Sequence, residues 1–208
     1  MKSLRIAVSV VLMLLATSAF AQSNAQSSSD KPKNPAGSAA GQAAQGQTPE
    51  ANPLSAFNKF IYGGTKNILL TTAEKMPEEN YNFKPTDTVR SFGQIVGHVA
   101  DAQYLFCSIS LGEANPAPKI EQTKTSKADL VAALKDAFAY CDKAYDAMTD
   151  ASATQPVKLF GGERPKLGAL SVNNIHNMEH YGNLATYMRL KNLVPPTSEA
   201  GFQAVPKK

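Results

Sequence analysis

Apolar side chains recur at steps of three and four residues in four stretches of this chain, and this spacing is typical of amphipathic α-helices. The stretches are residues 54–75, 91–111, 126–148 and 171–190. Ser91 and Ser126 stand at the starts of two of them, where serine is a favoured N-cap. Four helices of about 20 residues, joined by long connections, predict an all-α four-helix bundle.

The first stretch has one apolar stripe, formed by Leu54, Phe57, Ile61, Ile68 and Thr72. Two adjacent glycines, Gly63 and Gly64, lie in its middle. Each weakens a helix by about 1 kcal/mol relative to alanine, so close packing or a kink is expected there.

Two connections between the helices carry patterns of their own. The loop over residues 77–90 contains Tyr81 and Phe83, which we expect to pack over the end of the bundle. The connection before the fourth helix contains an alternating run at residues 157–160, followed by two glycines, and predicts a short extended segment or a hairpin. Two strands do not make a sheet-based domain, so the expected fold stays all-α.

Residues 1–21 have the pattern of a signal peptide. Lys2 and Arg5 precede an uncharged apolar run at residues 6–16, and residues 19–21 form an A-x-A cleavage pattern. The apolar run is short for a membrane span, and no later segment has about 18 consecutive apolar residues. We therefore expect an exported protein, periplasmic or secreted, with no stable membrane insertion after cleavage.

The rest of the chain divides into a linker, one domain and a tail. Residues 22–52 have no aromatic and no large aliphatic side chain, so we expect a disordered low-complexity linker. Residues 53–200 are long enough for one domain with a hydrophobic core, and residues 201–208 form a C-terminal tail. Removal of residues 1–21, which hold two basic and no acidic residues, lowers the formal net charge from +4 to +2. This small charge argues against a nucleic-acid partner.

All three histidines of the chain lie on predicted helices. His176 and His180 are four residues apart on the fourth helix, so both rings can face one ion. His98 lies at the edge of the apolar face of the second helix, and we expect its ring to point inward. Three histidines on two helices predict a metal site with an open position for water or substrate. The alternative is a structural pair, because two helical histidines at this spacing often arise by chance.

Other polar residues near the histidines are candidates for a role at the site. Asp101 is a candidate catalytic residue, as a water-holding base, or an acceptor for the N–H of a ligand; the alternative is a solvated charge. Asn173 and Tyr187 are placed where they would line a pocket. Glu179 completes the pattern H-x-x-E-H, which is typical of one class of metalloproteases. A peptidase is disfavoured, because a downstream carboxylate ligand on a further helix is missing.

Cys107 and Cys141 are the only cysteines. Cys107 is about half a turn out of phase with His98 on a 3.6-residue helix, so we expect it to face away from a metal. In an oxidising compartment the two sulfurs can form a disulfide. Two small core residues are the open alternative, since cysteine packs like a small apolar side chain.

Three segments carry a resemblance to a known family: NYNFKPTDTVRSFGQ before the second helix, FGQIVGHVADAQ within it, and HNMEHYGNLATYMRLKNLVPP in the fourth. Over about residues 53–200 the chain resembles the DinB-like (YfiT-like) family of metal-binding four-helix bundles. The resemblance implies a divalent metal, commonly zinc or nickel, held by one histidine of the second helix and two of the fourth. Those positions match His98, His176 and His180.

The relatives in that family include thiol-dependent S-transferases and a mycothiol-dependent maleylpyruvate isomerase, and two function classes stay open. The first is a metal-dependent hydrolase or thiol S-transferase that acts on a small-molecule substrate or thiol. The second is a non-catalytic metal- or ligand-binding module of the cell envelope. Export argues against the thiol chemistry, because the thiol cofactors of those relatives are cytoplasmic. A homodimer is open in both cases, and no motif identifies a substrate.

Overall fold

The computed structural model describes residues 51–205, in which four long helices dominate. The predicted signal peptide and nearly all of the predicted linker lie outside the described residues, as do residues 206–208. The long helices are α1 (Pro53–Lys75), α2 (Phe92–Leu111), α4 (Lys127–Ala147) and α6 (Lys166–Leu190). They confirm the predicted all-α bundle.

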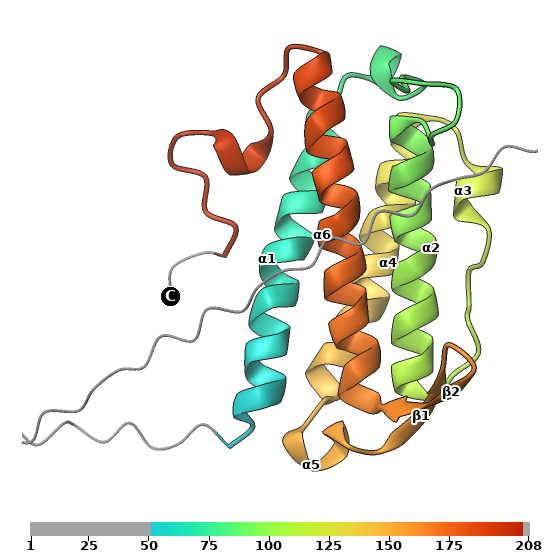
Figure 1. Cartoon of the computed structure of the whole chain (residues 1–208), viewed down its shortest axis with the longest axis vertical. Helices are drawn as coiled ribbons and strands as arrows, with labels where there is room; N and C mark the ends of the chain where they lie inside the picture. The colour runs from blue at the N-terminus through green and yellow to red at the C-terminus, as the bar shows by residue number, and fades with distance from the viewer. Residues whose placement is uncertain (1–50, 206–208) are drawn as a thin grey trace, which may run out of the picture. The chain divides into compact units, whose positions relative to one another are not determined.

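The long helices neighbour one another in the order α1, α6, α2, α4 around the bundle, and α4 closes the ring against α1 (Figure 1). Helices α1 and α6 run side by side in the same direction, and α2 and α4 run the opposite way. The contact between α2 and α6 brings the two histidine-bearing helices together. No helix within residues 51–205 combines the length and the apolarity needed to cross a bilayer.

Short elements fill the connections between these helices. The two strands pair antiparallel, with Pro156 opposite Pro165, which confirms the predicted hairpin. Phe160 and Gly161 at its tip have positive φ angles of 52° and 74°. The short elements are the 3-10 helices η1 (Glu78–Asn80) and η2 (Pro196–Ser198), the helical turns α3 (Ile120–Thr123) and α5 (Asp150–Ala153), and the strands β1 (Pro156–Leu159) and β2 (Gly162–Pro165).

Serine caps begin α2 and α4. Ser91 Oγ accepts the N–H of Gln94 at 3.2 Å, and Gln94 Oε1 accepts the N–H of Ser91 at 2.8 Å, which is a reciprocal capping box. Ser126 Oγ accepts the N–H of Asp129 at 3.1 Å. Gly112 ends α2 with a φ of 74°, a left-handed conformation that glycine adopts without steric strain.

The apolar stripe of α1 is split between the core and the surface. Ile68 and Thr72 are buried, whereas Leu54 and Phe57 are 65% and 63% exposed and Ile61 is also exposed. Within residues 51–205, other parts of the protein therefore bury only the C-terminal half of the α1 stripe, although the stripe is continuous in the sequence. The aromatic packing expected at the bundle end is present, since Tyr81 is buried and donates its hydroxyl proton to a backbone carbonyl of α1.

Gly64 lets the C-terminal segment approach α1. A Cβ atom at Gly64 would lie 3.0 Å from Cγ2 of Val205. Next to this point, Asn67 Nδ2 donates a hydrogen bond to the carbonyl oxygen of Gln203 at 3.1 Å. At Gly63, by contrast, a Cβ would meet nothing within 4 Å. Close packing therefore explains Gly64 and not Gly63.

A disulfide joins Cys107 of α2 to Cys141 of α4, with their Cα atoms 5.3 Å apart. Both cysteines are fully buried. Of the two alternatives open in the sequence, the disulfide is the correct one, and Cys107 faces α4 rather than the histidines.

Candidate metal centre

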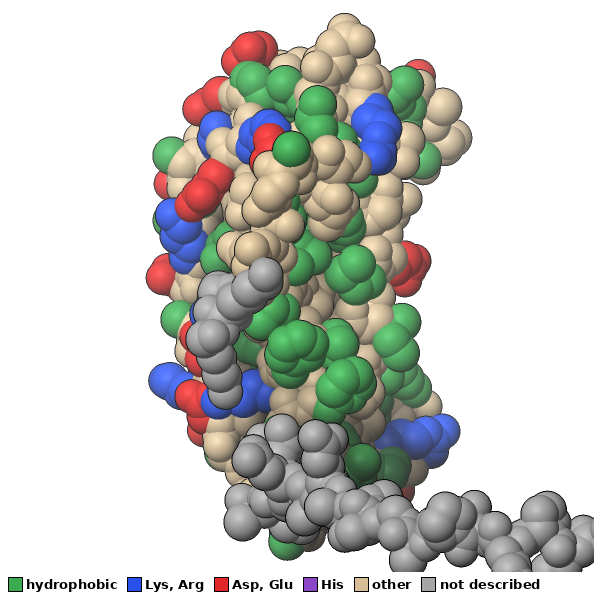
Figure 2. All heavy atoms as spheres, turned by 90° about the vertical axis from the view of Figure 1, so that its left-hand side faces the viewer, with side chains coloured by type: hydrophobic (Ala, Val, Ile, Leu, Met, Phe, Trp, Pro, Cys, Tyr) green, Lys and Arg blue, Asp and Glu red, His purple; other side chains and the backbone are tan. Residues whose placement is uncertain are grey.

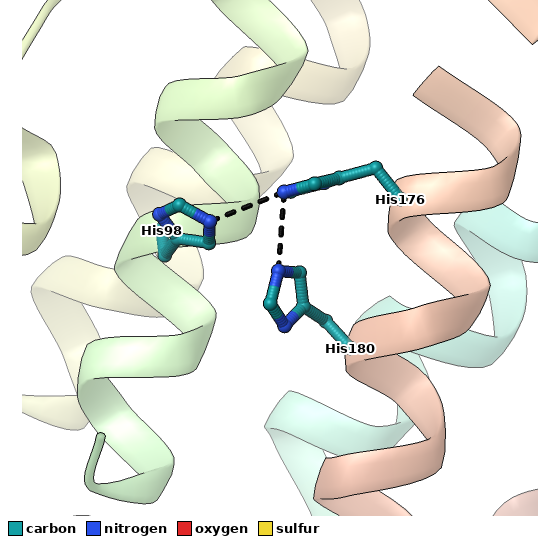
Figure 3. A group of neighbouring side chains, drawn as sticks. All are labelled: His98, His176 and His180. Atoms are coloured by element: carbon teal, nitrogen blue, oxygen red, sulfur yellow. Dashed lines mark hydrogen bonds between the residues drawn. The ribbon is translucent and has the colours of Figure 1, made fainter. Parts of the chain in front are cut away.

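The three histidines meet where α2 packs against α6 (Figure 3). His98 projects from α2, and His176 and His180 project from successive turns of α6. Nε2 of His176 lies 3.1 Å from Nε2 of His98 and 3.1 Å from Nε2 of His180. The structure therefore brings together all three predicted ligands and forms a cluster able to hold a metal ion.

The spacing of the three nitrogens suits one tetrahedral ion. Zinc binds imidazole nitrogen at about 2.0–2.1 Å, which puts two nitrogens on a tetrahedral ion about 3.3 Å apart. The two separations from Nε2 of His176, both 3.1 Å, are close to this value, and the three ligand atoms all lie within 4.8 Å of one another. Within residues 51–205 the group contains no cysteine and no carboxylate. Three neutral nitrogen ligands leave a fourth position for water or substrate.

Burial keeps the rings on α6 neutral. Burial, followed by repulsion from His180 and His98, lowers the pKa of His176 to about 3. Burial, followed by repulsion from His98, also lowers the pKa of His180. Both imidazoles therefore carry a free lone pair at neutral pH, which is the form that binds a metal.

A carboxylate reaches the outer side of His98. Oε2 of Glu121, on α3, lies 3.2 Å from Nδ1 of His98, and Oε1 of Glu121 accepts the Nε–H of Arg90 at 2.8 Å. The Nε2 atom on the other side of the same ring faces His176. Sequence reasoning missed Glu121, because it lies 23 residues after His98 in a helical turn too short to show a periodic pattern.

Asp101 holds α3 against α2. Its Oδ1 accepts the N–H of Ile120 at 2.7 Å, and its Oδ2 accepts the N–H of Glu121 at 2.9 Å. A Cβ atom on Gly97 would lie only 2.7 Å from Cα of Glu121, so glycine is required for this close approach. Asp101 is therefore not simply a solvated charge. Both of its oxygens accept hydrogen bonds from the backbone of α3. Its catalytic role stays a prediction.

A buried amide network sets the register of α2 against α6 near the histidines. Gln103 Nε2 donates to Oδ1 of Asn177 at 2.5 Å, and Asn173 Nδ2 donates to Oε1 of Gln103 at 2.8 Å. Asn173 also donates to the hydroxyl of Tyr145 at 3.3 Å. All three amide side chains are fully buried. The expectation that Asn173 lines a pocket is therefore wrong, because it lies in the core.

Two clefts open beside the histidines. The larger, of about 700 Å³, is mostly polar, and its lining includes Arg90, Glu179, His180, Asn183 and Tyr187. The smaller, of about 300 Å³, is mostly apolar, and its lining includes His98, Ala102, Leu105, Phe106 and His176. Tyr187 lines a cleft as the sequence predicts, and its hydroxyl donates to the carbonyl oxygen of Arg90 at 3.0 Å. A small molecule can thus approach the histidines through a polar or an apolar opening.

Comparison with known proteins identifies the family of this chain. A model of the DinB superfamily matches residues 63–184, which is more than half of the chain. The chain belongs to the DinB superfamily. The family that the sequence motifs resemble is thereby confirmed, together with its helical fold.

Relatives of this DinB-superfamily chain occur in Bacillus. It is 24% identical to the uncharacterized protein YjoA of Bacillus subtilis (strain 168) over 127 residues, which are 60% of this chain and 82% of YjoA. The crystal structure of YjoA, a DinB-like protein, aligns with a TM-score of 0.54 at 23% identity, covering 68% of this chain and 93% of YjoA. A DinB-like protein from Bacillus cereus ATCC 10987 aligns with a TM-score of 0.58 at 17% identity, covering 69% of this chain and 93% of that protein. These likenesses concern the fold and assign no activity.

Proposed function

We propose that this DinB-superfamily protein binds one divalent transition metal ion through the Nε2 atoms of His98, His176 and His180. The observation that carries the proposal is the convergence of these three nitrogens: Nε2 of His176 lies 3.1 Å from each of the other two, and the ligand atoms of the group all lie within 4.8 Å of one another. A hydrogen bond between two neutral rings satisfies only one pair of nitrogens, whereas a cation satisfies all three lone pairs at once. Buried polar atoms without partners are unfavourable, so the arrangement favours a bound ion.

The native ion in this proposal is zinc or nickel. Imidazole nitrogen suits late transition metals, whereas magnesium, calcium and manganese prefer carboxylate and carbonyl oxygen. The cluster within residues 51–205 offers nitrogen alone. The ligand set therefore supports zinc or nickel, and it favours neither of them over the other.

The proposed activity is that of a metal-dependent hydrolase or thiol S-transferase. A structural zinc normally has four protein ligands, whereas three ligands are typical of catalytic sites. A bound ion would supply Lewis-acid activation of a water or thiol at the open position. Phe106 packs edge-on against His176, with ring centroids 5.8 Å apart, and both rings line the smaller cleft. The two clefts would admit the substrate beside the three rings.

Export of the protein is part of the proposal. Residues 1–21 have the sequence pattern of a signal peptide. The disulfide between Cys107 and Cys141 supports an oxidising compartment, because such bonds are rare in cytosolic proteins.

The metal content of the protein tests the ligand assignment. Protein purified without an affinity tag should contain one metal ion per chain, as measured by elemental (inductively coupled plasma) mass spectrometry. His176→Ala should lose most of this metal and keep a helical circular-dichroism spectrum, because the bundle core does not depend on that ring. Asn183→Ala, in the larger cleft, is the control and should keep the metal. Equimolar metal in a variant with all three histidines replaced by alanine would refute the assignment.

Cobalt substitution tests the open position. Added azide or a small thiol should change the visible spectrum of the cobalt protein, because either ligand can enter a position that the protein leaves free. Activity would then be sought with ester, amide and thiol-transfer substrates. An unchanged spectrum and no turnover would favour the alternative, a non-catalytic metal-binding module.

A further inference from the structure

Arg90, Glu121 and His98 form a chain of polar contacts that continues outward from the proposed ligands. Among the three histidines, His98 is the one whose Nδ1 meets a carboxylate. The Nδ1 atoms of His176 and His180 are buried and have no hydrogen-bond partner among the described residues. His98 therefore differs from the pair on α6 in having a hydrogen-bond partner for its Nδ1 atom.

We propose that Glu121 is a positioning residue that holds the proton of His98 on Nδ1 and so directs the Nε2 lone pair toward the metal. This inference rests on the proposed metal function. A carboxylate that accepts Nδ1–H fixes the tautomer and the orientation of the ring, and it makes the other nitrogen a stronger ligand. The guanidinium of Arg90, bound to the second oxygen of Glu121, holds the carboxylate in this orientation.

The helix that carries His98 also carries the anchors of Glu121. Gly97, one residue before His98, leaves the space that α3 occupies. Asp101, three residues after His98, binds the N–H groups of Ile120 and Glu121 with its two oxygens. The ligand and its carboxylate are therefore placed by the same turn of α2, which keeps their separation independent of the more distant parts of the bundle.

The test is zinc affinity, measured by competition with a chromophoric chelator. Glu121→Gln keeps an acceptor oxygen and loses the charge, whereas Glu121→Ala loses both. We expect zinc binding to weaken by about 10-fold in the first variant and by up to about 100-fold in the second. The visible spectrum of the cobalt form should also change in Glu121→Ala, because the His98 ring is no longer held. A loss of stability alone would not alter that spectrum.

Glu179→Gln is the matched control, because Glu179 is an exposed carboxylate that lines the same cleft as His180. It should bind zinc like the unmodified protein. If Glu179→Gln weakens zinc binding as much as Glu121→Gln, the loss of affinity comes from the loss of negative charge near the site, and the positioning role is refuted. Unchanged affinity in both Glu121 variants would refute it as well. If the unmodified protein binds no metal, the proposed function fails, and this inference fails with it.

A second, independent observation is an exposed apolar face on neighbouring helices. Leu54, Phe57 and Ile61 of α1 are large and exposed, as are Ile175 and Met178 of α6, which packs beside α1. Figure 2 shows hydrophobic side chains gathered on the lower part of the side where α1 lies. Monomeric proteins rarely expose contiguous apolar patches of large size, so this face is suited to a partner.

We infer that a second copy of this chain covers this face. Residues 22–50 and 206–208 contain no aromatic and no large aliphatic side chain to cover it, and residues 1–21 are expected to be removed. An anionic membrane is disfavoured, because every lysine of α1 is paired: Lys59 with Asp146, Lys66 with Asp142 and Lys75 with Glu199. Two parallel helices that meet their copies across a twofold axis form a four-helix layer.

Light scattering coupled to size-exclusion chromatography tests this interface on the mature chain beginning at Gln22. The unmodified protein should have the mass of a dimer, and Phe57→Lys and Ile175→Lys should each have the mass of a monomer. Phe160→Lys, at the exposed aromatic tip of the hairpin, is the control and should stay dimeric. A monomeric unmodified protein would refute the inference, as would a dimer that survives both lysine substitutions. A monomer that sediments with phosphatidylglycerol vesicles would assign the face to a membrane instead.

Discussion

Reduction of the disulfide between Cys107 and Cys141 should lower the free energy of unfolding substantially. The bond closes a loop with a sequence separation of 34 residues. The chain-entropy relation gives a loss of about 12.6 cal/mol/K for a loop of this length, which is about 3.8 kcal/mol at 25 °C. For a domain of about 150 residues, with an unfolding entropy of about 0.3 kcal/mol/K, the melting temperature should fall by about 12 °C.

The comparison of oxidised and reduced protein isolates the cross-link, because both forms keep the same side chains. Both cysteines are fully buried, so two thiols fill nearly the same space as the disulfide. Burial also means that a reductant should reach the bond only when the protein unfolds. The protein is therefore reduced in denaturant and refolded with reductant present, and guanidinium unfolding curves are recorded by circular dichroism.

Alkylation of thiols in denaturant, followed by mass measurement, shows the state of each sample. Cys107→Ala combined with Cys141→Ala should lose at least as much stability as reduction, because truncation also leaves a small cavity. A difference of less than about 1 kcal/mol between fully oxidised and fully reduced protein would refute the loop-entropy reasoning. Two free thiols in the untreated protein would refute the disulfide itself.

Three further predictions concern the helices, the N-terminal segment and the metal. Gly63→Ala should raise the free energy of unfolding by about 0.5–1 kcal/mol, because a Cβ there meets open space. Gly97→Ala should lower both the free energy of unfolding and the zinc affinity, because a Cβ there meets Cα of Glu121. Guanidinium unfolding and zinc titration measure the two effects. A protein beginning at Ala51 should melt within a few degrees of one beginning at Gln22, since the deleted segment has no large apolar side chain; a large drop in calorimetry would contradict this. Free zinc at about 100 times its dissociation constant should stabilise the native state by about 2.7 kcal/mol and raise the melting temperature by about 9 °C. His176→Ala should show no such rise.

Periodicity located the four long helices because each carries apolar side chains along one face, whether or not the whole of that face is buried. The start of α6 was less well predicted, since the helix begins at Lys166 rather than at residue 171. The hydroxyl of Ser171 donates to the carbonyl oxygen of Leu167 at 3.0 Å, which is the bonding of a serine inside a helix. Ala169 and Leu170 are fully buried, so the apolar face already begins before residue 171.

The three histidines were predictable because two share a helix face and the third lies at the edge of another. Glu121 was not, because its distance from His98 depends on how the connection between α2 and α4 folds back. That connection is held by its own N–H groups, at Ile120 and Glu121, which donate to the carboxylate of Asp101. A contact between a side chain and backbone N–H groups produces no periodic pattern in a sequence. The exposed half of the α1 stripe shows the same limit, since Phe57 and Ile68 look equivalent in the pattern and differ only in what covers them.

Helix α2 connects the candidate metal centre to the rest of the bundle. Between Gly97 and Cys107, this helix is tied to α3 through Asp101, to α6 through Gln103 and to α4 through the disulfide. Asp101 lies on one side of the helix and Gln103 and Cys107 lie on another, so together the contacts restrict both its rotation and its sliding. His98 lies within the same segment, so these contacts help to position its ring opposite the pair on α6. Ligands that are held by such contacts lose little conformational entropy when they bind an ion, which is why we expect metal affinity to follow the integrity of α2 as closely as the presence of the three rings.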